Sequence, residues 1–116
     1  MSPGAAPTGD ASGDVFHALA DPTRREVVRL LSERGALSAS ALARELGAEG
    51  RSISRQGVAK HLAILRDAGL ADVEREGREA RYRFEPAPLG DAISWMAAAG
   101  ARWDQRLERL RDTLPR

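Results

Sequence analysis

A polar stretch near the middle of the chain combines an amide with two cations: Gln56 lies beside Arg55 and four residues before Lys60. An amide can bind a base edge through two hydrogen bonds, and a cation can bind a phosphate or a guanine. Ser54 can cap the start of a helix over 54–68. The polar side chains would then lie on the first two turns of that helix, the end that a recognition helix inserts into the major groove of DNA.

The other face of this helix is apolar, as a packed helix requires. Val58, Leu62 and Leu65 recur at i, i+4 and i+7, so they predict one buried stripe. Gly69 follows at a position where a left-handed residue can end a helix. An ordinary amphipathic surface helix has the same pattern. The neighbouring elements must therefore decide between a surface helix and a recognition helix.

Composition and charge limit the classes of function. The chain has 116 residues and a formal net charge of +1, so affinity for DNA would depend on local clusters of charge. It has no cysteine, which excludes disulfides, thiolate metal sites and thiol redox sensing within the chain. We expect no cofactor, no metal site, no membrane segment and a cytoplasmic location. The sequence presents no clustered acid–base pair, nucleophile triad or phosphate loop, so we do not expect an enzyme.

The N-terminal third of the chain predicts a tail and two helices. Residues 1–13 are mostly small residues with little to bury, and we interpret them as a disordered tail. A short apolar helix follows from Asp14. The second helix has Asp21 as N-cap and Pro22 as its first residue, and continues to about Arg34. Three arginines of this helix remain for solvent, or for phosphates if DNA is bound: Arg24, Arg25 and Arg29.

A third, short helix is predicted before the polar one. Ser38 caps it and Gly47 ends it, and the connection over 47–53 is polar and contains glycine. Two short helices joined by a turn, the second with a polar tip, form a helix-turn-helix. Arg51 in the connection could reach a phosphate.

After Leu70 the apolar residues alternate at every second position, which predicts two strands over 71–84. A two-residue turn at Gly77-Arg78 joins them into a hairpin, or wing. This register predicts two inward apolar pairs, Ala71–Phe84 and Val73–Tyr82. It also predicts two outward pairs of opposite charge, Glu74–Arg81 and Asp72–Arg83. Arg78 at the tip and Arg75 near it have the freer reach to a minor groove or a phosphate.

A last helix begins near Pro86 and Pro88 and runs to about Thr113. It would span roughly 40 Å at about 1.5 Å per residue, too long for one small core to cover. Its apolar residues alternate at intervals of four and three up to Leu114, which is a heptad seam. We expect 89–114 to form a dimerisation helix with a two-fold copy. The interface residues expected on it are Leu89, Ile93, Met96, Gly100, Trp103, Leu107 and Leu110.

The ordered set of motifs resembles the ArsR family of bacterial winged-helix repressors. The resemblance covers about 14–114 and implies a mostly α winged helix-turn-helix with a small β-hairpin, ordered helix-helix-helix-helix-strand-strand-helix. It also implies a homodimer formed by the first and last helices, Phe16 included, that binds an imperfect palindrome near a promoter. The segments that carry it are 18–25, 54–62, 65–70 and 75–78, with Tyr82.

The family's DNA-facing residues can be carried over by position. They are Ser54, Arg55, Gln56, Ala59, Lys60 and His61. From their chemistry we expect Arg55 and Gln56 to read bases and Ser54 and Lys60 to bind phosphate, whereas His61 fits a phosphate contact or a packing role equally.

Two departures from the family pattern matter. The third helix has no cysteines and the last helix no histidine, so neither of the family's metal sites can be carried over, and the chain is more similar to the non-metal-sensing branch. The connection over 47–53 is longer than the family's usual turn.

Together these features predict a sequence-specific, DNA-binding transcriptional regulator. We expect a homodimeric repressor that binds double-stranded DNA with the helix over 54–68 and the wing over 71–84. Two alternatives stay open. One is a winged-helix module that binds a protein. The other is a sensor of an unidentified effector, either a metal on mixed Asp, Glu and His ligands or a small molecule near Trp95 and Trp103.

Overall fold

The helices and strands of the protein follow the predicted order, with one added strand. A computed structural model describes the backbone of residues 8–113 and the side chains of residues 14–113. The elements are α1 (Thr8–Leu19), α2 (Pro22–Arg34), β1 (Leu37–Ser38), α3 (Ala39–Ala48), α4 (Arg55–Asp67), β2 (Ala71–Glu76), β3 (Glu79–Phe84) and α5 (Ala87–Thr113). Leu114, the end of the predicted seam, lies outside the described residues.

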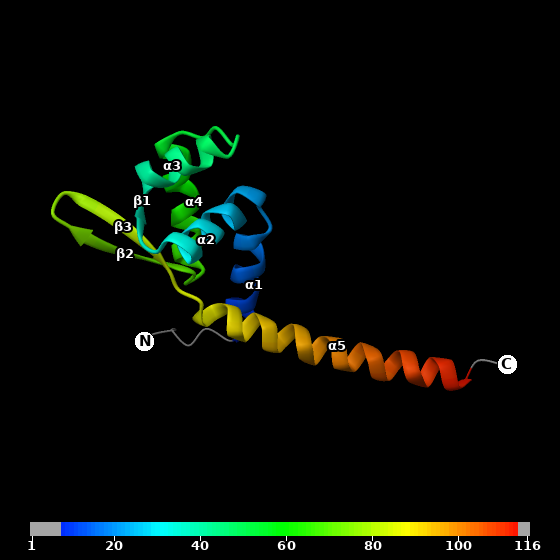
Figure 1. The fold of residues 1–116 in the computed structure, drawn as a ribbon. Coiled ribbons are helices and arrows are strands. Elements are labelled where there is room, and N and C mark those ends of the chain that lie inside the picture. Colours follow the sequence, from blue (N-terminus) through cyan, green and yellow to red (C-terminus); the bar gives the residue numbers. More distant parts are fainter. Residues whose placement is uncertain (1–7, 114–116) are drawn as a thin grey trace, which may run out of the picture.

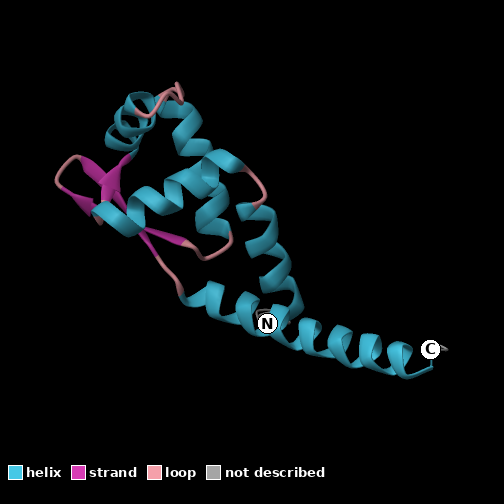
Figure 2. Cartoon of the chain, turned by 45° about the vertical axis from the view of Figure 1, so that its right-hand side comes forward, coloured by secondary structure: helices cyan, strands magenta, loops and turns pink. Residues whose placement is uncertain are grey.

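Helices α1 to α4 form a cluster, with the β2–β3 hairpin projecting from one side and α5 passing along its base (Figure 1). The C-terminal half of α5 leaves the cluster and extends away from it in both views (Figures 1 and 2). The described residues thus form a mostly helical winged helix-turn-helix with one long helix attached. Within 8–113, no helix is both long enough and apolar enough to cross a membrane.

Helix α1 begins earlier than expected, at Thr8 rather than Asp14. The prediction of a disordered tail over 1–13 is therefore wrong for residues 8–13, and residues 1–7 lie outside the described part of the chain. The pattern missed this extension because a backbone can continue as a helix through small and polar residues, where no apolar period marks it.

The predicted N-caps of α2, α3 and α4 are confirmed. In each, the capping oxygen accepts a hydrogen bond of 3.0–3.1 Å from the backbone N–H three residues later. The pairs are Asp21–Arg24, Ser38–Ala41 and Ser54–Gly57. Gly35 and Gly69 take positive φ angles of 85° and 77° after α2 and α4, as expected where a left-handed residue ends a helix.

The expected end of α3 at Gly47 is wrong, because the helix continues to Ala48. The left-handed residue is instead Gly50, with φ of 84°. The backbone N–H of Arg51 donates to the carbonyl of Leu46 at 2.8 Å and closes this turn. A glycine inside a helix costs only about 1 kcal/mol, so Gly47 alone does not stop it.

The core sits between α2, α3 and α4 and closes against α1 and the start of the sheet. The predicted stripe of α4 is confirmed, because its three apolar side chains are fully buried. With that stripe packed inward, the polar side chains of the first turns of α4 face outward. The fully buried large side chains are Val15, Val27, Leu30, Leu42, Leu46, Val58, Leu62, Leu65 and Leu70.

The hairpin has the predicted register, including all four predicted pairs. Gly77 takes φ of 64° in the two-residue turn. The sheet has three strands in the order β1-β3-β2, because Leu37 and Ser38 pair with β3. A two-residue strand is too short to show an alternating pattern, so the sequence did not predict it.

Of the two predicted ion pairs across the hairpin, Asp72–Arg83 is confirmed and Glu74–Arg81 is not formed. Arg83 contacts both Asp72 at 3.1 Å and Glu74 at 2.9 Å. Arg81 instead contacts Glu79 at 3.1 Å and Glu76 at 3.4 Å. Diagonal neighbours across a sheet lie within reach of long side chains, so the backbone register alone does not determine which charges meet.

Arg24 is buried, which corrects its expected exposure. Its side chain donates from Nε to the carbonyl of Ala18 at 2.6 Å and from Nη2 to that of His17 at 3.2 Å. Arg24 thereby ties α2 to the end of α1. Arg25 stays exposed while donating to the carbonyls of Leu19 and Ala20.

Arg24→Met is expected to lower the free energy of unfolding by about 2 kcal/mol, because it removes the side-chain donor from the buried carbonyl of Ala18. Urea unfolding followed by circular dichroism, at one fixed protein concentration, measures this. Arg25→Met is the matched control. It should cost less than about 0.5 kcal/mol, since water replaces its exposed hydrogen bonds. Equal losses for the two variants would contradict the anchoring role of Arg24.

Asp21 links the stability of α2 to pH. The backbone N–H of Arg24 donates to its carboxylate and, with the nearby charges of His61 and Arg24, holds the pKa of Asp21 below its ordinary value of 3.8. The pKa of Asp21 is lower in the folded chain than in the unfolded chain. The carboxylate therefore stabilises the fold above pH 3.8, and this stabilisation is lost as the pH falls through the folded pKa.

Asp21→Ala is therefore expected to cost about 1 kcal/mol near neutral pH, with the difference from the wild type shrinking in acid. Urea unfolding across a pH series measures it. Asp21→Asn keeps an uncharged capping oxygen and should show no such acid-dependent change. A loss for Asp21→Ala that stays constant down to strongly acidic pH would contradict a role for the carboxylate charge.

Candidate nucleic-acid interface

The start of α4 and the hairpin line one groove of about 320 Å³. Arg55, Gln56 and Ala59 line it from α4, and Arg75 and Arg78 line it from the hairpin. These two sets of residues were proposed separately from the sequence, and the fold brings them to one surface. The groove therefore joins an amide and several guanidinium groups that come from two different elements.

The cations of this surface differ from the other arginines of the hairpin. Arg55, Lys60, Arg75 and Arg78 are exposed, and none of them forms an ion pair with another residue of the described chain. The remaining hairpin arginines are held by carboxylates on the strands. Positive charge is thus available at the tip of α4 and at the tip of the wing, although the net charge of the chain is only +1.

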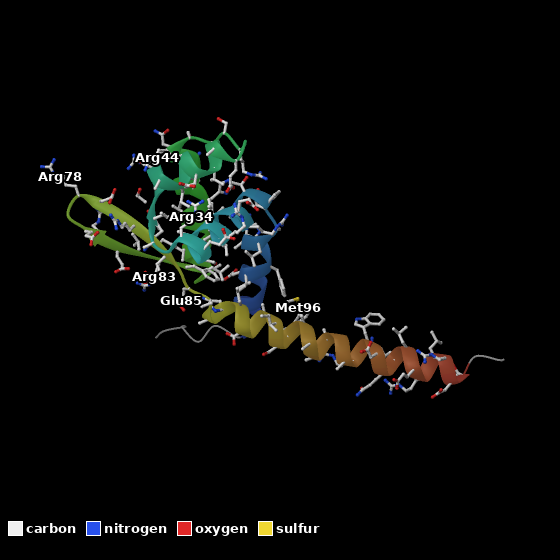
Figure 3. All side chains as sticks on the ribbon, viewed as in Figure 1. Arg34, Arg44, Arg78, Arg83, Glu85 and Met96 are labelled. Carbon is white, nitrogen blue, oxygen red and sulfur yellow. The ribbon has the colours of Figure 1, made fainter. Side chains whose placement is uncertain are left out.

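Two groups on α3 were missed by the sequence reasoning. Ser40 lines it from the first turn of α3. Arg44 is exposed on α3 and projects to the same side of the view as Arg78 at the hairpin tip (Figure 3). The first helix of a helix-turn-helix crosses the DNA backbone, so the position of Ser40 two residues after the Ser38 cap is the signal that could have identified it.

Ser54 lies at the N-terminus of α4 as expected. Its Oγ accepts from the N–H of Gly57 at 3.0 Å, and its hydroxyl hydrogen can still donate. The N-terminus of a helix favours an anion. A phosphate beside Ser54 would therefore meet both the hydroxyl and the positive end of the helix dipole.

His61 contacts the core side of the domain. Its Nδ1 lies 3.3 Å from Nη1 of Arg24 and 3.9 Å from Asp21. The ring of His61 thus lies against Arg24 and Asp21, away from the groove. The geometry favours the packing role of His61 over the expected contact with DNA.

Arg51 does not line the groove. Its Nη1 donates to Oγ1 of Thr23 at 3.1 Å, so the side chain lies against the start of α2. The expectation that Arg51 reaches a phosphate is therefore not supported by its position. Within the described residues, no three His, Asp or Glu side chains gather closely enough to hold a metal ion.

The apolar face of α5 is uncovered over most of its length. Trp103, Leu107 and Leu110 are 60%, 52% and 56% exposed, and every residue from 100 to 113 is exposed. Gly100 has room for a side chain within the single chain, since an added Cβ would meet nothing within 4 Å. A stripe of this kind indicates an interaction surface.

The first half of α5 packs in part on its own domain. Leu89 is half-buried and packs against the core. Phe16 of α1 meets Trp95 edge-to-face, with ring centroids 5.7 Å apart. Ile93 and Met96 remain 58% and 47% exposed, and Met96 lies close to the place where α5 passes α1 (Figure 3). The uncovered face therefore continues from α5 onto α1.

The fold and the groove define a winged helix-turn-helix DNA-binding protein. Residues 19–74 match a helix-turn-helix domain family. The HTH-type transcriptional regulator YuzN of Bacillus subtilis is 42% identical over 80 residues, which cover 68% of this chain and 87% of YuzN. The transcriptional repressor SdpR of the same organism is 35% identical over 83 residues, which cover 72% of this chain and 86% of SdpR.

A solved structure supports the same assignment. The ArsR-like transcriptional regulator from Rhodococcus sp. RHA1 is 39% identical to this chain, with a TM-score of 0.77. The structural alignment covers 90% of this chain and 93% of that one. The chain belongs to the ArsR family of winged helix-turn-helix transcriptional regulators. It is a DNA-binding regulator of transcription.

Proposed function

We propose that the protein is a homodimeric repressor that binds an imperfect palindrome in double-stranded DNA. The observation that carries this proposal is the groove in which Arg55 and Gln56 of α4 meet Arg75 and Arg78 of the wing. An amide and unpaired guanidinium groups on one surface suit a duplex, because they can contact base edges and phosphates at the same time.

Each group of the surface has a role that follows from its chemistry. Gln56 would bind an adenine and Arg55 a guanine through two hydrogen bonds. Ala59 is small enough to let the helix approach the bases. Lys60 and Ser54 would bind phosphates and set the position of the helix.

The wing would contact the duplex beside the recognition helix. Arg78 lies at the hairpin tip, and Arg75 lines the same groove as α4. Both would reach a minor groove or a phosphate. Arg81 and Arg83 are held by strand carboxylates and would stabilise the hairpin.

Dimerisation would use the face formed by α1 and α5. Within the described residues, the large apolar side chains from 103 to 110 are exposed and lie outside the core, and the same face of a two-fold copy is the simplest partner. Gly100 would let the two helices approach closely. The residues proposed at this interface are Phe16, Leu89, Ile93, Met96, Gly100, Trp103, Leu107 and Leu110.

We further propose that release from DNA does not use thiolate coordination of a metal, because the whole sequence has no cysteine. Because the last helix also has no histidine, neither of the family's metal sites can be carried over, and we place the protein in the non-metal-sensing branch. We place its activity in the cytoplasm, where the DNA of bacteria such as Bacillus subtilis lies.

A mobility-shift assay with the DNA upstream of the protein's own gene tests this proposal. We expect a shift that weakens as salt rises, because phosphate contacts release counterions. An unrelated duplex of the same length is the control and should need much more protein. The absence of a salt-sensitive shift would contradict the proposal and favour a winged-helix module that binds a protein.

A further inference from the structure

The long connection between α3 and α4 is held against α2 at two points. We call residues 49–54 the lead-in. Oε1 of Glu49 contacts Nη2 of Arg29, and Nη1 of Arg51 donates to Oγ1 of Thr23 at 3.1 Å. Both partners belong to α2, so the lead-in lies along one fixed helix.

Arg29 is itself held in place by its own helix. Its Nε donates to Glu26 at 2.9 Å and its Nη1 to Glu33 at 2.9 Å. Nη2 contacts Glu49 and also lies 2.9 Å from Oε1 of Glu26, so the two carboxylates share it. The hydrogen bonds that Arg29 donates to Glu49 and Glu26 raise the pKa of Arg29 above its ordinary value, so the guanidinium stays charged.

The other end of the lead-in packs directly on α4. Ile53 is half-buried and covers Gly57, where an added Cβ would lie 2.9 Å from Cγ1 of Ile53. Ser54 caps the helix immediately after Ile53. A shift of the lead-in would therefore move the first turn of α4, which carries Arg55 and Gln56.

We propose that Arg29 is a positioning residue for DNA recognition, which acts through Glu49 to set the direction in which α4 presents Arg55 and Gln56. This inference rests on the proposed function. Arg29 does not line the groove, and its role would be to hold the lead-in while α4 lies in the major groove. The longer connection would then be a rigid support for α4.

The competing interpretation is a solvated ion pair without consequence for binding. Exposed pairs contribute little to stability, and the Arg29 and Glu49 side chains are 35% and 37% exposed. The two interpretations differ in what they predict for sequence preference. A solvated pair leaves it unchanged, whereas a positioning contact changes it.

Glu49→Gln and Glu33→Gln form a matched pair for the test. Each removes one carboxylate from Arg29 and changes the net charge by the same amount, but only Glu49 belongs to the lead-in. Fluorescence anisotropy would give Kd for a duplex enriched by the wild type from a random library and for a random duplex. We expect Glu49→Gln to lower the ratio of the two affinities by about fivefold, and Glu33→Gln to leave it within about twofold of the wild type.

The double variant Arg29→Gln, Glu49→Gln tests whether the two residues act together. It should lower the ratio of the two affinities no further than Arg29→Gln alone does, because that single substitution already breaks the contact with Glu49. Partial unfolding would lower both affinities alike and leave the ratio unchanged, so the ratio separates positioning from stability.

Equal ratios for Glu49→Gln and Glu33→Gln, or additive losses in the double variant, would overturn the positioning role. A wild type that does not discriminate between the two duplexes would instead overturn the proposed function.

Discussion

Leu107→Glu is expected to prevent dimerisation and to weaken binding to a palindromic duplex by about 10²- to 10⁴-fold, because the second half-site is then no longer bound intramolecularly. Leu107 is 52% exposed on the free half of α5. A glutamate there would carry a charge into the proposed interface, where its desolvation is costly. The single domain should stay folded, since Leu107 is not part of the core.

Gln105→Glu is the control for this prediction. It adds the same negative charge on α5 outside the apolar seam, so the dimer should persist. Sedimentation over a range of protein concentrations gives the oligomeric state, and anisotropy gives the affinity. If Leu107→Glu remained dimeric with wild-type affinity, the proposed role of α5 would be wrong.

Gln56→Ala is expected to weaken binding to the preferred duplex by about 1–3 kcal/mol while leaving random duplexes nearly unaffected. The side chain lies on the first turns of α4 and lines the groove with the wing. Removing it eliminates two hydrogen bonds to a base edge but no phosphate contact. Anisotropy titrations with both duplexes measure the difference.

Lys60→Ala provides the contrast for this second prediction. It should weaken binding to every sequence alike and flatten the dependence of affinity on salt by about one phosphate contact. An equal loss from Gln56→Ala on the preferred and the random duplex would contradict a base-reading role.

The register of the hairpin could be predicted from local sequence rules. A two-residue turn at Gly77 and the alternation of apolar residues determine a single register, and the structure has that register. The N-caps followed from equally local rules, since each needs one side-chain oxygen and one N–H three residues later. Features determined by neighbouring residues were therefore predictable.

Features that depend on distant residues were not predictable from the pattern. Arg24 looks like a surface residue by its type, and only the fold places the Ala18 carbonyl beside its guanidinium. Strand β1 exists because β3 offers it a partner. The end of α3 depends on Gly50 and on the backbone of Arg51, so Gly47 by itself was misleading.

The candidate site also combines features that depend on neighbouring residues with features that depend on distant ones. The polar tip of α4 could be identified from its residue types, but its meeting with Arg75 and Arg78 required the tertiary fold. Ser40 was missed although its position two residues after the Ser38 cap places it in the first turn of α3, and only the fold brings it to the groove. The contact of Glu49 with Arg29 joins residues that are twenty positions apart, and no periodicity connects them.

Selection of DNA from a random-sequence library by the purified protein tests the central claim most directly. The account predicts enrichment of an imperfect inverted repeat whose half-site centres lie about 10 base pairs apart, roughly one helical turn. Enrichment of a single unrepeated site, or of no sequence at all, would contradict a dimer that reads DNA with α4 and the wing.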